Sequence, residues 1–269
     1  MSSDRPSVVR RAAGRARRGW EAARERRRTQ RSLTELAQEY GSDKWGVHRY
    51  TPHYEQHFAP FRDRQMLVLE LGIGGYARER EGGASLRMWK SFFPRAQVVG
   101  VDIEDKSFVD EERITSFQGS QTDARLMRRI RGRFGRPTIV IDDGSHRPPH
   151  IKKSFRILFP MLADGGLYVI EDVQTSYWPQ WKGSLDLDDP STTMAMVKRL
   201  LDGLNHEEFL DDDYQPSYTD EHVTAVHCYH NLVVIEKGDN REGSNKRVAN
   251  KRWYARRATA EASPEFTEP

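Results

Sequence analysis

Short apolar stretches alternate with helical ones through the middle of this chain, and this alternation limits the fold more than any other feature. Five stretches rich in Val, Ile and Leu have the length of a β-strand, and they span residues 66–71, 97–102, 114–117, 138–142 and 167–171. Helical spacing of apolar residues is found after most of them, over residues 85–93, 122–131, 151–162 and 192–204. Strands that alternate with helices favour a parallel sheet covered by helices on both faces.

Two further strands follow near the end of this pattern. They span residues 223–229 and 232–237 and are separated only by His230 and Asn231, which predicts an antiparallel hairpin. The predicted fold is therefore α/β and Rossmann-like. It has a mostly parallel seven-stranded sheet, a C-terminal antiparallel hairpin and helices on both faces.

Basic residues are concentrated at the two ends of the chain. The formal net charge of +3 divides into +8 for residues 1–31, +3 for residues 241–269 and −8 for the segment between them. We predict a basic N-terminal helical arm over residues 1–35, one domain over 36–240 and a polar basic tail over 241–269. The arginine-rich arm raises the alternative of nucleic-acid binding. The acidic domain and the lack of a recognition motif make that alternative the weaker one.

Two features of the sequence concern the location of the protein in the cell. No apolar run approaches the roughly 20 residues of a membrane-spanning helix, and the arginine-rich start lacks the apolar segment of a secretory signal. The single cysteine, Cys228, allows no internal disulfide, and its place in a strand predicts that it is buried. We expect a cytoplasmic protein without a membrane partner.

A glycine-rich turn follows the first strand, with the sequence Glu-Leu-Gly-Ile-Gly-Gly over residues 70–75. Glycine lets a backbone approach a ligand closely. Asp102 ends the second strand, where a carboxylate can accept both ribose hydroxyls of an adenosine. This pair favours an adenosine-containing ligand, while the spacing also admits a dinucleotide or a simple turn.

Paired acids follow the next two strands. Residues 142–146 read Asp-Asp-Gly-Ser-His after the fourth strand, and Glu171 and Asp172 end the fifth. Neighbouring strands lie about 5 Å apart, so these carboxylates would repel one another unless a hard divalent cation such as Mg²⁺ joined them. His146 lies within reach as a general base. The alternative is that the acids only cap the following helices.

These motifs resemble those of class I S-adenosylmethionine-dependent methyltransferases. More narrowly, they are similar to the metal-dependent sugar O-methyltransferases of macrolide biosynthesis, in the tylosin and mycinamicin pathways. Further matching stretches are Tyr-Gly-Ser-Asp-Lys-Trp-Gly at 40–46, Gly-Gly-Ala-Ser-Leu-Arg-Met-Trp at 82–89 and Gln-Thr-Ser-Tyr-Trp at 174–178. The resemblance covers roughly residues 36–242.

The resemblance implies roles for individual residues. His146 would be the general base, and Mg²⁺ would be held by Asp143, Glu171 and Asp172. S-adenosylmethionine would be bound by Glu70, Gly72, Gly74, Gly75, Ser85, Asp102 and Gln121. Relatives tend to carry an acidic residue after the third strand, and in this chain Gln121 or Asp123 would take its place. The acceptor would meet Tyr54, Tyr177 and Trp178.

The implied activity is methyl transfer to a deoxysugar hydroxyl of a glycosylated polyketide or macrolide. Two alternatives remain open for the acceptor, a free nucleotide-linked sugar and a catechol. The resemblance also implies a homo-oligomer that binds a small-molecule glycoside or sugar. Tyr50, His53, Tyr54 and His57 fit either a lid over the ligands or packing against the sheet.

Overall fold

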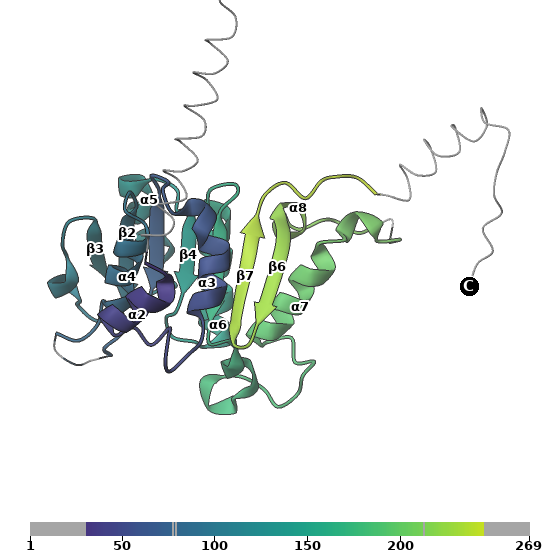
Figure 1. Cartoon of the computed structure of the whole chain (residues 1–269). Helices are drawn as coiled ribbons and strands as arrows, with labels where there is room; N and C mark the ends of the chain where they lie inside the picture. Colours follow the sequence, from purple (N-terminus) through teal and green to yellow (C-terminus); the bar gives the residue numbers. More distant parts are fainter. Residues whose placement is uncertain (1–30, 77, 79, 212, 245–269) are drawn as a thin grey trace, which may run out of the picture.

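A seven-stranded sheet forms the centre of the protein (Figure 1). The structure is a computed structural model, and it describes residues 31–244 apart from residues 77, 79 and 212. The strands are β1 (Leu67–Leu71), β2 (Gln97–Asp102), β3 (Ile114–Gln118), β4 (Ile139–Asp142), β5 (Leu167–Glu171), β6 (Val223–Tyr229) and β7 (Leu232–Lys237).

The strand order is β3-β2-β1-β4-β5-β7-β6. Strands β1 to β5 pair in parallel, and β7 pairs antiparallel with both of its neighbours, β5 and β6. The sheet confirms the predicted fold class, and the antiparallel pairing of β6 with β7 confirms the predicted hairpin. Both could be predicted because they depend on local apolar runs and on a two-residue turn. The order reverses direction at β1, which lies between β2 and β4. Open α/β sheets bind ligands at such a switch point, beyond the carboxyl ends of the strands.

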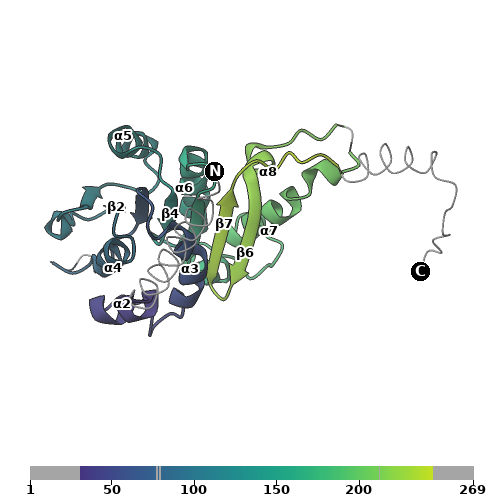
Figure 2. The ribbon, with the colours of Figure 1, turned by 45° about the horizontal axis from the view of Figure 1, so that its top comes forward.

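Helices cover both faces of the sheet, as Figure 2 shows. Three pack on one face: α2 (Leu33–Tyr40), α3 (Thr51–Phe58) and α4 (Ala84–Phe92). Three pack on the other: α5 (Ala124–Phe134), α6 (Pro148–Leu158) and α7 (Thr193–Gly203). A short helix, α8 (Tyr218–His222), leads into β6. Each face has its own cluster of buried apolar side chains.

The helix boundaries show where local signals shift an element. Helix α6 begins at Pro148, three residues before the expected start at 151, because proline is suited to the first turn of a helix. Helix α2 begins at Leu33 behind a capping box of Ser32 and Glu35. Residues 1–30 of the predicted arm and 245–269 of the predicted tail lie outside the described residues, so the division into arm, domain and tail stays a prediction.

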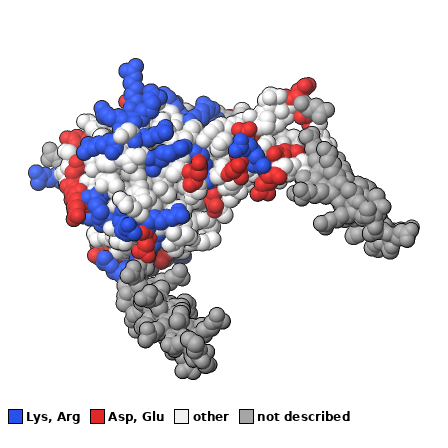
Figure 3. All heavy atoms as spheres, turned by 90° about the horizontal axis from the view of Figure 1, so that it is seen from above, with Lys and Arg blue, Asp and Glu red and all other residues white. Residues whose placement is uncertain are grey.

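One prediction about burial is wrong. Cys228 is exposed rather than buried, because β6 is the edge strand of the sheet and has a neighbour on one side only. Within the described residues, no helix is long and apolar enough to cross a membrane. The face seen in Figure 3 carries Lys and Arg side chains interspersed with Asp and Glu.

Candidate active site

The acidic residues found in the sequence gather at one end of the sheet. In the parallel register Leu71 pairs with Asp142, and Asp142 pairs with Ile170, so the ends of β1, β4 and β5 are level. Glu70, Asp143 and Glu171 therefore lie near one another, with ligand atoms within 4.8 Å. This confirms the expectation that strand order alone brings carboxylates from distant parts of the chain together.

The glycine turn after β1 is packed directly against the acidic loop after β4. A Cβ atom at Gly72 would lie 2.1 Å from the backbone oxygen of Asp143, and the φ angle of Gly72 is +89°. Only glycine fits there, because any side chain would collide with backbone. A Cβ at Gly75 would likewise lie 2.1 Å from the backbone oxygen of Glu81. Gly74, between them, has a φ of +76°.

Asp102 is anchored by the same turn. Its Oδ2 accepts a 2.8 Å hydrogen bond from the backbone N–H of Ile73, and its Oδ1 accepts one of 2.9 Å from Glu104. Ser85 lies near the start of α4 and donates a 2.9 Å hydrogen bond to Oε2 of Glu70. The turn, Asp102, Ser85 and Glu70 thus form one connected unit at the switch point of the sheet.

Gln121 braces the acidic loop. Its Nε2 donates to Oδ1 of Asp142 at 2.9 Å, and its Oε1 accepts from the backbone N–H of Ser145 at 2.7 Å. Both ends of the buried amide are used within the protein, which gives Gln121 a structural role that sequence reasoning missed. Its predicted contact with the cofactor stays a prediction.

A second group that could hold a cation contains Asp143, His146 and Asp172, whose ligand atoms also lie within 4.8 Å of one another. Nε2 of His146 is 3.8 Å from Oδ2 of Asp172. Both residues adopt a left-handed backbone, each with a φ of 53°. Such conformations cost free energy for residues other than glycine and cluster at functional sites.

Tyrosines from the segment before β1 hold the two acids that end the fifth strand. The hydroxyl of Tyr50 donates to Oδ1 of Asp172 at 2.6 Å, and that of Tyr54 donates to Oε1 of Glu171. Tyr54 is fully buried. The structure therefore corrects its predicted contact with the acceptor, because its hydroxyl supports Glu171 from inside the protein.

Lys44 is a further residue of the site that sequence reasoning missed. Its side chain is fully buried, and its Nζ lies 2.6 Å from Oε1 of Glu171, 2.7 Å from Oδ2 of Asp143 and 3.5 Å from Oε1 of Glu70. The only signal was its place in the Tyr-Gly-Ser-Asp-Lys-Trp-Gly motif, which carries no role by itself.

Burial dominates the electrostatics of the inner acids. It raises the pKa of Glu70 to about 7, with Lys44 opposing the rise. It also raises the pKa of Asp143 and, strongly, that of Glu171. Asp172 differs, since the Tyr50 hydrogen bond and the neighbouring His146 outweigh burial and hold its pKa below the usual value. Asp172 is therefore the most firmly ionised of these acids.

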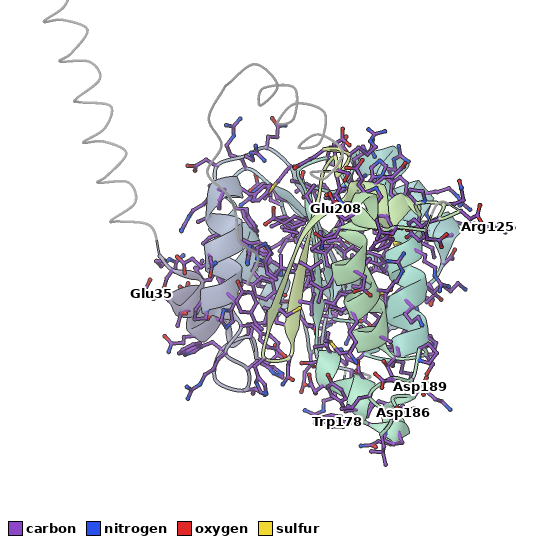
Figure 4. All side chains as sticks on the ribbon, turned by 90° about the vertical axis from the view of Figure 1, so that its right-hand side faces the viewer. Glu35, Arg125, Trp178, Asp186, Asp189 and Glu208 are labelled. Carbon is purple, nitrogen blue, oxygen red and sulfur yellow. The ribbon has the colours of Figure 1, made fainter. Side chains whose placement is uncertain are left out.

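The loop after β5 supplies exposed aromatic residues. Tyr177 and Trp178 have 42% and 41% of their surface exposed, so both are open to a ligand. Figure 4 shows Trp178 at the same end of the molecule as Asp186 and Asp189. The ring centroid of Trp181 is 6.1 Å from that of His146, which places an aromatic face beside the candidate base.

The donor set fits a hard divalent cation. Protein donors occupy Oδ2 of Asp143, Oε1 of Glu171 and Oδ1 of Asp172, so each carboxylate has a second oxygen to offer. Nδ1 of His146 is buried without a hydrogen-bond partner among the described residues. Carboxylate-rich sites of this kind favour Mg²⁺ over thiolate-seeking metals.

No family model matches the chain. The chain is 49% identical over 214 residues to mycinamicin VI 2''-O-methyltransferase of Micromonospora griseorubida, covering 78% of this chain and 54% of that protein. It is equally similar, over the same length, to demethylmacrocin O-methyltransferase of Streptomyces fradiae.

Solved structures agree with the sequence comparison. MycE methyltransferase from the mycinamycin biosynthetic pathway, in complex with Mg, SAH and mycinamycin VI, matches with a TM-score of 0.78 and 44% identity. That match covers 86% of this chain and 60% of MycE. The chain thus spans about half the length of the curated relatives it matches.

The sheet order and the switch-point turn define a class I methyltransferase fold. Within that class, the matched region resembles the sugar O-methyltransferases of macrolide and related antibiotic pathways, as expected from the motifs.

Proposed function

We propose that this protein is an O-methyltransferase that uses S-adenosylmethionine and a divalent metal, Mg²⁺, to methylate a deoxysugar hydroxyl of a glycosylated polyketide or macrolide. The combination of sequence similarity and site geometry supports the proposal. The chain is 43–49% identical to five sugar O-methyltransferases of antibiotic pathways and gathers Asp143, His146 and Asp172 at the switch point of the sheet. The MycE structure, which matches this fold, is a complex with Mg, SAH and mycinamycin VI.

The connected unit at the end of β1 fits the cofactor. The Gly72–Gly75 turn would accept its methionine portion with Ser85, while Glu70 lies beneath the turn as the buried partner of Ser85. Asp102 would accept the ribose hydroxyls, since each carboxylate oxygen that already accepts a backbone N–H retains a second lone pair.

The metal would be held by Asp143, Glu171 and Asp172. When bound, a divalent cation lowers the pKa of a coordinated hydroxyl and offsets the charge of the carboxylates. The protein's part is to keep these acids in place, through Lys44 on Asp143 and Glu171 and through Tyr50 on Asp172.

His146 would act as the general base. The acceptor hydroxyl loses its proton to Nε2 of His146, and the oxygen takes the methyl group as the carbon–sulfur bond breaks and its electron pair stays on sulfur. The products are a methyl ether and S-adenosylhomocysteine. Asp172, 3.8 Å from Nε2, stabilises the imidazolium that results. Alignment of oxygen, methyl and sulfur accounts for most of the rate.

Tyr177 and Trp178, together with Trp181, would contact the acceptor. The exposed rings of Tyr177 and Trp178 suit the apolar faces of a sugar or an aglycone, and the half-buried Trp181 lies beside the base. A free nucleotide-linked sugar and a catechol remain the alternative acceptors, since each also offers two adjacent oxygens. Nucleic-acid methylation has less support, because the described domain carries mixed charges on the face seen in Figure 3.

The test is transfer of labelled methyl from S-adenosylmethionine, with Mg²⁺ or with EDTA. The acceptor panel holds deoxysugar-bearing polyketides, free nucleotide sugars and a catechol. We expect label in a glycoside with Mg²⁺ and none with EDTA. Label only in a nucleotide sugar would move the reaction before glycosyl transfer, and activity that survives EDTA would refute the metal.

Two broader expectations belong to this proposal. The resemblance supports a homo-oligomer, and light scattering of the full chain would test it by giving a mass above 31.2 kDa. A monomeric mass would refute it. A cytoplasmic location is consistent with the lack of a membrane-spanning helix in the described part of the chain. Cell fractionation with a tagged full chain tests this location.

A further inference from the structure

Lys44 occupies a place where a metal ion would otherwise fit. The group formed by Glu70, Asp143 and Glu171 has ligand atoms within 4.8 Å of one another, which is sufficient to hold a cation. The Lys44 ammonium lies among these carboxylates, at 2.6, 2.7 and 3.5 Å. We call this group the inner cage, and the Asp143–His146–Asp172 group the outer cage.

The inner cage is deeper than the outer one. Lys44 and Glu70 have no exposed side-chain surface and Glu171 has 3%, whereas His146 and Asp172 have 18% and 17%; Asp143, which both cages share, has 21%. Glu70 and Glu171, buried beside Asp143, need a cation, because unpaired buried charge is costly. The chain provides that cation itself from 26 residues upstream of Glu70.

The lysine is held by its own segment. The backbone oxygen of Lys44 accepts a 3.1 Å hydrogen bond from Tyr50 N–H, and Trp45 pairs with Arg49 as an isolated bridge. The same segment presents the hydroxyl of Tyr50 to Asp172. One braced loop therefore places a charge in the inner cage and a hydroxyl at the edge of the outer cage.

Resting on the function proposed above, we propose that Lys44 is a built-in counter-cation that fills the inner cage and so confines the divalent ion to the remaining oxygens of Asp143, Glu171 and Asp172, beside His146. Lys44 takes one oxygen of Asp143 and one of Glu171, which fixes the direction of the other oxygen of each. It is a positioning residue, because it acts on the carboxylates and touches neither cofactor nor acceptor.

Replacement of Lys44 should change the number of divalent ions that bind to each chain. In Lys44→Met the inner cage loses its cation while Met fills a similar volume. We expect the variant to bind one more divalent ion per chain than the unsubstituted protein. Manganese binding to the full chain, followed by electron paramagnetic resonance without cofactor or acceptor, counts the ions. Lys44→Arg keeps the charge and should keep the original count.

Lys237→Met is the matched control. Lys237 is also buried and donates a 2.8 Å hydrogen bond to the backbone oxygen of Leu162, at the opposite end of the sheet. Its replacement carries the general cost of removing a buried ammonium but opens no cage of carboxylates. We expect the manganese count of Lys237→Met to equal that of the unsubstituted protein.

A second measurement covers the case in which Lys44→Met folds poorly. At pH 8, above the raised pKa of Glu70, Glu70→Gln removes one negative charge from the inner cage, so it should harm the protein with Lys44 present but restore stability when Lys44 is Met. A double-mutant cycle of unfolding midpoints reads this coupling. A role in packing alone would give additive shifts.

Two results would overturn the inference: an equal ion count in Lys44→Met with unchanged affinity, or additive shifts in the cycle. The decisive quantity is the difference of one ion between variant and parent. If the parent binds no ion and Lys44→Met binds one, the proposed metal dependence fails while the role of Lys44 stands.

Discussion

Nε2 of His146 lies 3.8 Å from Oδ2 of Asp172, and both residues hold the same left-handed backbone with a φ of 53°. His146 follows β4 by a short loop and Asp172 comes directly after β5, so backbone turns at the ends of two separate strands place these side chains near one another. Residues in such conformations persist only when their surroundings fix them. Here Thr175 Oγ1 donates a 2.6 Å hydrogen bond to the backbone oxygen of His146 and a 3.0 Å bond to that of Asp172.

Replacement of His146 tests the general base. We choose His146→Asn, because asparagine tolerates a left-handed backbone and the substitution should not disturb the turn. Turnover should fall by about 10²- to 10⁴-fold, the usual contribution of general-base catalysis. Binding of S-adenosylmethionine, measured by calorimetry, should stay unchanged because the cofactor unit lies at β1. Near-normal turnover would remove His146 from the role.

Replacement of Asp172 tests the metal ligand. Asp172→Asn keeps the shape, the left-handed backbone and an oxygen for the Tyr50 hydroxyl, but it loses the charge. The Mg²⁺ concentration that gives half-maximal activity should rise at least ~10-fold, as even the outer partners of metal ligands contribute that much. Asp189→Asn is the control, since Asp189 accepts a hydrogen bond from Ser191 N–H in a turn outside the acidic group. An unchanged Mg²⁺ requirement in Asp172→Asn would count against this ligand.

Replacement of Trp181 tests the acceptor side of the site. Its ring lies 6.1 Å from that of His146, so it is placed to contact the sugar that the base deprotonates. Trp181→Ala should raise the KM for the glycoside roughly fivefold, since an aromatic contact is worth about 1 kcal/mol. The KM for S-adenosylmethionine should not move. Leu187→Ala, exposed in the same loop, serves as control. Equal KM values in Trp181→Ala and its parent would place the acceptor elsewhere.

Particular residues show how far sequence reasoning could go. The gathering of Asp143, Glu171 and Asp172 at one end of the sheet followed from strand periodicity and from the rule that parallel strands end at one edge. Strand periodicity depends only on neighbouring residues, and a regular parallel sheet always brings the carboxyl ends of its strands to one edge. The hairpin was specified in the same way, by two strands and a two-residue turn.

The residues that support the acids were outside the reach of such reasoning. Lys44 meets Asp143 across 99 residues of sequence and Glu171 across 127, and it does so from a loop without periodicity. Tyr54 could equally have covered a ligand or packed inside, and the choice depends on how α3 lies against the sheet. Tertiary packing decides such contacts, and no spacing in the sequence encodes it.

The buried carboxyl of Glu70 makes stability depend on pH in a direction that can be worked out. Its pKa is raised from 4.5 to about 7 because burial disfavours the charged form. Between these values the folded chain holds a proton that the unfolded chain has released, so raising the pH across this window favours unfolding. The free energy of unfolding should therefore fall between about pH 4.5 and 7, by on the order of 3 kcal/mol from this group.

Glu70→Gln should remove that slope, because the amide has no proton to lose. The measurement is chemical unfolding of metal-free protein in EDTA at a series of pH values, for the parent, Glu70→Gln and the exposed control Glu112→Gln. The parent and the control should lose stability together, while Glu70→Gln should lose less and be relatively more stable at pH 8 than at pH 5. Parallel pH curves for Glu70→Gln and the parent would show that the Glu70 carboxyl stays ionised in the folded protein. The Lys44 ammonium would then neutralise it fully, despite lying 3.5 Å from Oε1 of Glu70 and closer to the other two acids.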